Sequence, residues 1–147
     1  MSYITIDMTA TEKASLVSLW SMVSHGVNDL GGEAFERLFF SAPQTKRLFT
    51  HFDLNHGSAD MKTFGGKVLT VFGSATTHLD NLGGILATLD DLLGKNLKVD
   101  PDHLSMLTHT ILVTLATHFP RDFTPMVQAT WYKFISKMFA LLTSKRI

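Results

Sequence analysis

Histidine is the side chain in this sequence best suited to metal or acid–base chemistry, and it occurs seven times. The positions are His25, His51, His56, His78, His103, His109 and His118. None belongs to a His-Glu-x-x-His motif, and the chain also lacks Gly-x-Ser-x-Gly, Walker and Gly-x-Gly-x-x-Gly patterns. The neighbouring acids Asp90 and Asp91 are better explained as the solvated side of a helix than as an acid–base pair. The sequence therefore predicts no catalytic residue and no enzyme.

The composition gives no sign of a charged partner. Thirteen basic and thirteen acidic residues cancel in a chain of 147 residues, and they are scattered rather than clustered. There is no cysteine, so disulfides and thiolate metal sites are excluded. No apolar run approaches the roughly 18 residues of a spanning helix, and no signal-peptide pattern is visible. We expect a cytoplasmic protein with neither a nucleic-acid nor a membrane partner.

Apolar residues recur at every third or fourth position along most of the chain, which is the spacing of an amphipathic helix. Thr9 and Glu12 have the spacing of a capping box and predict a helix start. The firmest period runs over residues 61–79, followed by a glycine-containing break at 81–84 and a short apolar helix that ends near Gly94. Sustained apolar–polar alternation, the signature of a strand, is absent. The pattern predicts an all-α protein of six to eight helices.

Several longer strings carry a resemblance to a known family. The strings are HFDLNHGSADMK, LKVDP, ILVTLATHFP, FTPMVQA and LLTSK. With them, the chain resembles the vertebrate haemoglobin α-type globins over nearly its whole length. The resemblance implies the globin fold, with helices packed around a central haem-type pocket. It also implies one globin domain over residues 1–147, of which 1–8 form a short N-terminal extension.

The resemblance also implies which residues line the pocket. They are Phe49, His51, Phe52, Phe64, Lys67, Val68, Leu89, Leu92, Leu93, Leu97, Val99, His103, Leu104, Leu107 and Leu142. Phe64 matches the position of the family's distal histidine, and Leu93 matches the position of the proximal histidine. A phenylalanine or leucine side chain cannot coordinate iron. His103 matches a position at the haem edge and is the remaining candidate metal ligand, although it is offset from the iron.

Two hypotheses follow from these two substitutions. In the first, the chain takes no cofactor and serves as a module that binds a small apolar molecule or another globin, with Phe64 and Leu93 filling the space of the haem. In the alternative, it is a haem-binding, oxygen-transporting haemoglobin subunit with unusual iron ligation. A haem-dependent redox activity is a third option and ranks below both. The sequence favours the first hypothesis.

A partner surface is implied by the same resemblance. Arg37, His109, Phe123, Pro125 and Gln128 match or approximate positions at which α-type chains pack against a β-type chain. His118 falls on the same partner-facing helix as His109. We therefore expect a homodimer, or a heterodimer with another globin chain.

Overall fold

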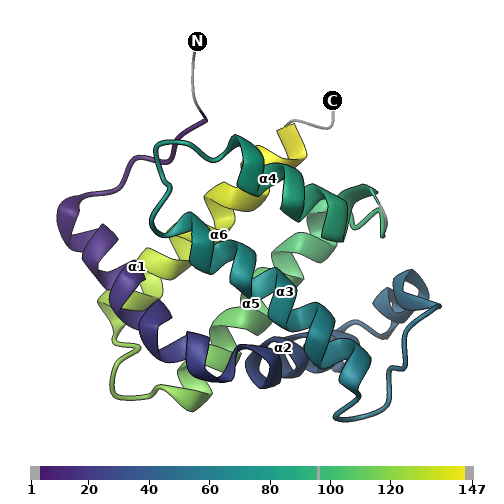
Figure 1. The fold of residues 1–147 in the computed structure, drawn as a ribbon. Helices are drawn as coiled ribbons and strands as arrows, with labels where there is room; N and C mark the ends of the chain where they lie inside the picture. The colour runs from purple at the N-terminus through teal and green to yellow at the C-terminus, as the bar shows by residue number, and fades with distance from the viewer. Residues whose placement is uncertain (1–3, 96, 145–147) are drawn as a thin grey trace.

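The computed structural model describes residues 4–95 and 97–144, and within these ranges the chain is helical without strands. The helices are α1 (Ala10–Val23), α2 (Val27–Ser41), α3 (Ala59–Ala75), α4 (Gly83–Leu89), α5 (Pro101–His118) and α6 (Pro125–Ser144). Three shorter turns connect them: η1 (Ser24–Gly26), η2 (Pro43–Phe49) and the π-helical η3 (Asp90–Lys95). Figure 1 shows α3 crossing α2, with α5 and α6 behind them. The predicted all-α class and helix number are confirmed.

Side-chain caps set several of the helix starts. The Thr9 hydroxyl accepts a hydrogen bond from the Glu12 N–H at 3.1 Å, and the Glu12 carboxylate accepts one from the Thr9 N–H at 2.8 Å. This reciprocal pair is the capping box that the sequence predicts for α1. The Ser58 hydroxyl caps α3 with a single bond, accepted from the Met61 N–H at 3.2 Å, which is why that helix begins at Ala59 rather than at Met61.

The structure corrects the expected break before α4. Gly83 and Gly84 lie inside the helix rather than in a turn, because the Leu82 carbonyl already accepts the first helical hydrogen bond from the Leu86 N–H at 2.8 Å. The α-helical pattern then stops at Leu89, and the chain continues in the wider π-helical turn of η3. The predicted single helix ending near Gly94 is therefore two consecutive elements.

Two glycines allow α2 and α3 to cross closely. A Cβ atom built on Gly31 would overlap the backbone of Gly65, and one built on Gly65 would overlap the backbone of Gly31. The crossing brings the apolar faces of α2 and α3 together over one continuous core that also includes residues from α1, α4, α5 and α6. In the described part of the chain, we find no helix with the length and apolarity that membrane crossing requires.

Candidate functional site

An aromatic cluster surrounds Phe64 on α3. Its ring lies 5.3 Å from that of Phe35, 5.6 Å from that of Phe49 and 5.3 Å from that of Phe52, measured between centroids. The planes meet at 65° to 78°, which is the edge-to-face geometry that aromatic rings prefer. The α3 periodicity turns Phe64 inward, and η2 brings Phe49 to meet it. Phe64 is thus a packed core residue.

Leu93 lies in η3 and is 1% exposed. Leu86 and Leu89 of α4 are buried to the same extent, so α4 and η3 present a continuous apolar face to the core. The Leu93 carbonyl accepts a hydrogen bond from the Val99 N–H at 2.9 Å, which fixes the backbone after the π-helical turn. Side-chain packing and this backbone bond hold Leu93 in place.

The residues that the sequence assigns to the pocket fall into three groups by exposure. Most are buried: Phe49, Phe64, Val68, Leu89, Leu93, Val99, Leu104, Leu107 and Leu142. Phe52, Leu92, Leu97 and His103 are partly buried, and His51 and Lys67 are exposed. The buried group belongs to one hydrophobic core. The exposed His51 and Lys67 leave polar atoms only at the margin of the assigned set, while its centre is apolar.

His103 stands in the first turn of α5. Its Nδ1 atom lies 3.4 Å from an Asp100 carboxylate oxygen, and the side chain is 20% exposed. The geometry is not that of a hydrogen bond, so Nδ1 is buried without a hydrogen-bond partner. The Asp100 side chain accepts its hydrogen bond from the backbone N–H of His103 instead, at 3.0 Å. The imidazole is therefore held beside Asp100, with Nδ1 buried against that carboxylate.

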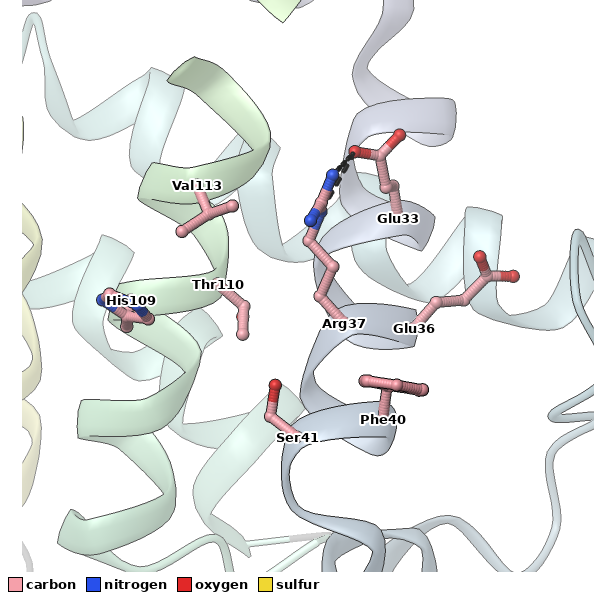
Figure 2. Close-up of a pocket in the computed structure, with 8 residues that line it drawn as sticks. All are labelled: Glu33, Glu36, Arg37, Phe40, Ser41, His109, Thr110 and Val113. Atoms are coloured by element: carbon pink, nitrogen blue, oxygen red, sulfur yellow. Dashed lines mark hydrogen bonds and ion pairs between the residues drawn. The ribbon is translucent and has the colours of Figure 1, made fainter. Parts of the chain in front are cut away.

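A separate groove of about 390 Å³ lies between α2 and α5. It is lined by Glu33, Glu36, Arg37, Phe40 and Ser41 from α2, and by His109, Thr110 and Val113 from α5. In Figure 2, Thr110 and Val113 of α5 and Arg37 and Ser41 of α2 lie toward the space between the two helices, whereas Glu36 extends away from α5 and His109 lies on the side of α5 away from α2. Of the predicted partner residues, Arg37 and His109 both line this groove. We call this surface the α2–α5 groove.

Charged groups at one end of the α2–α5 groove pair within the chain. The Arg37 guanidinium donates to the Glu33 carboxylate at 3.1 Å, and the His118 ring nitrogen lies 2.8 Å from its other oxygen. Burial raises the pKa of the Glu33 carboxyl, but the hydrogen bonds and charges of His118 and Arg37 outweigh burial and hold it below the usual glutamate value. Glu33 therefore remains ionised and ties α2 to α5.

The other three predicted partner residues lie at the turn into α6. Pro125 and Gln128 are exposed, and the Gln128 amide donates a hydrogen bond to the Phe123 carbonyl at 2.9 Å. Phe123 itself is 3% exposed. Its side chain supports the turn from within the core, so a partner would meet Pro125 and Gln128 rather than the Phe123 ring.

Only Arg37 and His109 of the groove were predicted as partner residues, and Phe40 is the aromatic residue among those that sequence reasoning missed. Its side chain is 89% exposed, although it is a large apolar group. A signal was present: Leu38, Phe39 and Phe40 are consecutive on one helix, and successive helical residues point about 100° apart. Because Leu38 and Phe39 are buried, the third must turn outward.

Comparison with known proteins identifies the family. The Globin family model matches residues 32–142. The chain belongs to the globin family. This globin is 49% identical to hemoglobin subunit alpha-3 of Xenopus laevis over 140 residues, which are 95% of this chain and 99% of that protein. Hemoglobin subunit alpha-3 of Aquarana catesbeiana is 50% identical over 139 residues, and human hemoglobin subunit zeta is 44% identical over 140, each covering 95% of this chain and 99% of the relative. The chain is therefore similar to α-type haemoglobin subunits in particular.

The comparisons correct the cofactor that the sequence predicts. We expected none, with haem as the alternative, but the globin match and the similarity to haemoglobin alpha subunits point to haem. The prediction of no cofactor is wrong. The same findings favour the alternative function, a haem-binding haemoglobin subunit, over the haem-free hypothesis.

The residues of this globin fit a haem only in part. The apolar surroundings of Val68, Leu107 and Leu142 suit a porphyrin, but these side chains are at most 1% exposed, so no haem-sized space adjoins them. Phe64 and Leu93 carry no donor atom, so neither can coordinate iron. Among the described residues, no three His, Cys, Asp or Glu side chains gather as for a metal ion, although a haem iron needs only one protein ligand. The lining therefore has the apolar chemistry that a porphyrin requires but is closed in this structure, and Phe64 and Leu93 supply no ligand for the iron.

Proposed function

We propose that this globin is an α-type haemoglobin subunit that binds haem and takes part in oxygen transport, with iron ligation that departs from the family pattern. The observation that carries the proposal is the 49% identity to a haemoglobin alpha subunit across 95% of the chain. The apolar residues gathered beneath α3, α4 and α5 support it, because porphyrins bind in apolar surroundings. A cytoplasmic location and a carrier role without catalysis belong to the same proposal.

The ligation is the unusual part of the proposal. Leu93 and Phe64 occupy the positions assigned to the proximal and distal histidines, and neither side chain can bind iron or donate a hydrogen bond to a bound gas. Haem would therefore be held by apolar contacts with residues such as Val68 and Leu107. His103 is the candidate protein ligand, because it matches a position at the haem edge, although its Nδ1 atom would first have to leave its buried place 3.4 Å from the Asp100 carboxylate.

The partner in this proposal is a β-type globin chain. The relatives are named as haemoglobin subunits, and the lining of the α2–α5 groove includes Arg37, His109 and an exposed aromatic ring, Phe40. Exposed aromatic and arginine side chains are enriched at the centres of protein interfaces. Pro125 and Gln128 extend the same proposed surface toward α6.

A haem titration tests the proposal. Purified protein is titrated with haemin, reduced and exposed to carbon monoxide, and its absorption spectrum is followed. We expect a Soret band that saturates at one haem per chain and shifts with carbon monoxide. His103→Ala, compared with His109→Ala as a control in the groove, tests the candidate ligand, and only His103→Ala should alter the reduced spectrum.

Leu93→His is the positive control, because it supplies an imidazole at the proximal position. If Leu93→His binds haem stoichiometrically while the natural protein, with a native helical circular dichroism spectrum, does not, the proposed haem-binding function is wrong.

A further inference from the structure

The described start of the chain pairs with the loop that leads into α4. The Ile6 N–H donates to the Leu79 carbonyl at 2.9 Å, and the Leu82 N–H donates to the Ile4 carbonyl at 2.9 Å. The two bonds run in opposite directions between the two segments. Figure 1 shows the purple N-terminal segment passing beside the teal loop before α4. Residues 4–8 are therefore attached to this loop through their backbone.

Side-chain burial reinforces the pairing. Ile6 is 5% exposed and Met8 is 9% exposed, whereas Thr5 and Asp7 between and beside them are exposed. This alternation is that of an extended segment with one face on the core. Residues 1–3 of the predicted extension lie outside the described residues. The described part is packed as a structural element and is not a free tail.

Leu82 connects this pairing directly to α4. Its N–H donates to Ile4, and its carbonyl accepts the first α4 hydrogen bond from Leu86. Its side chain is 0% exposed. The start of α4 is therefore fixed on one side by the N-terminal segment, and α4 continues through η3 to Leu93. We call residues 83–95 the α4–η3 segment.

Core packing and a backbone hydrogen bond hold the rest of the α4–η3 segment. Leu86, Leu89 and Leu93 pack into the core, and the Leu93 carbonyl bonds to Val99 at the far end. A Cβ atom added to Gly83 or Gly84 would meet no atom within 4 Å, so no neighbouring element packs closely against these two residues in the first turn of α4. The near end of the segment thus depends on Leu82 and on what holds Leu82.

We propose that residues 4–8 form a latch that keeps the α4–η3 segment docked on the apolar core and so controls how readily the core opens beneath that segment. Opening moves Leu93 away from the core, which is the movement that a bulky flat ligand requires for entry because the lining side chains are otherwise closed around one another. The part of this inference that concerns haem rests on the proposed function. The docking itself does not.

Hydrogen exchange followed by mass spectrometry tests the latch in the full-length protein. Ile6→Pro removes the N–H that bonds to Leu79, and Ile6→Ala removes the buried side chain but keeps that N–H. We expect exchange over residues 83–95 to become about tenfold faster in Ile6→Pro and less so in Ile6→Ala, with residues 101–118 of α5 unchanged. Haemin uptake, measured by stopped flow, should accelerate in the same order.

Thr5→Pro is the matched control, because Thr5 is exposed and its N–H takes no part in the pairing. It should leave exchange over 83–95 at the natural rate. Faster exchange confined to residues 4–8 in the Ile6 variants would overturn the latch, and so would equal acceleration across all helices. A haem titration without a Soret band would contradict the proposed function. It would not test the latch, which the hydrogen-exchange measurement decides separately.

Discussion

Phe64 stabilises the fold through contacts with three other aromatic rings, and these contacts depend on the full size of its side chain. Truncation to alanine leaves a cavity that the surrounding rings, fixed edge to face, refill incompletely. We expect Phe64→Ala to lower the free energy of unfolding by about 3–5 kcal/mol in urea denaturation. Phe40→Ala removes the same atoms from an 89% exposed position, and should change stability by less than about 0.5 kcal/mol. Similar losses in both variants would contradict the packing described for Phe64.

Glu33 is the residue from which a pH dependence follows. Because its pKa in the folded chain lies below the usual value, its stabilising contribution is present above the unfolded pKa of about 4.3 and is lost as pH falls through the folded pKa. Glu33→Gln should destabilise the protein by up to about 1 kcal/mol at neutral pH, since the partners are partly exposed, and by less at about pH 3.5. Urea denaturation at the two pH values measures this difference. Asp122→Asn makes the same charge change at an exposed position and is the control, for which we expect only a small change in the free energy of unfolding.

At the scale of the elements, the α2–α3 crossing is the contact that tolerates least change. A methyl group on Gly65 would overlap the Gly31 backbone, which cannot turn away as a flexible side chain could. We expect Gly65→Ala to reduce the free energy of unfolding by about 2 kcal/mol or more. Gly84→Ala makes the same change in α4 with no atom within 4 Å, and should stabilise the protein by about 0.5–1 kcal/mol through better helix propensity. Thermal unfolding of the pair checks both signs, and destabilisation by Gly84→Ala would mean that α4 packs more tightly than described.

The elements also show what the sequence could predict. The period over residues 61–79 and the Thr9 capping box predicted α3 and α1, because local patterns carry that information. The glycines at 83–84 were misjudged, since Leu82 supplies the helical bond that keeps them in α4. The π-helical turn of η3 has no local signal, and it follows from how Leu93 packs in the core. Tertiary contacts decided both cases.

In the candidate site, too, some features could be predicted from the sequence and others depend on tertiary contacts. Family resemblance predicted the apolar lining, and most of those residues are buried in one core. The ring geometry around Phe64 could not be predicted, because it depends on four side chains from three separate segments of the chain. The exposed Phe40 was missed for a simpler reason: the helical period was applied to the buried face only.

At the scale of the whole molecule, the apolar core and the α2–α5 groove are separate regions joined by α2. One face of α2 carries Phe35 into the aromatic cluster, and another carries Arg37 and Phe40 into the groove. A partner bound in the groove would therefore contact the same helix that packs against Phe64. A mutation of Phe40 can therefore change assembly without changing the packing of the core, because Phe40 makes little contact with the rest of the chain.

Assembly through the α2–α5 groove predicts a specific loss when Phe40 is replaced. Truncation of an aromatic side chain at the centre of an interface commonly costs about 2 kcal/mol or more, so Phe40→Ser should weaken binding to a β-type haemoglobin chain by at least about tenfold. Sedimentation velocity of the mixed chains measures the change in dissociation constant. Val17→Ser removes an apolar group that is 44% exposed on α1, outside the proposed surface, and should bind the partner more nearly as the natural chain does. Unchanged affinity in Phe40→Ser, with the expected weakening found instead in Val17→Ser, would move the interface from the α2–α5 groove to α1. Because Phe40→Ser leaves the core intact, a loss of binding would report on the groove and not on folding.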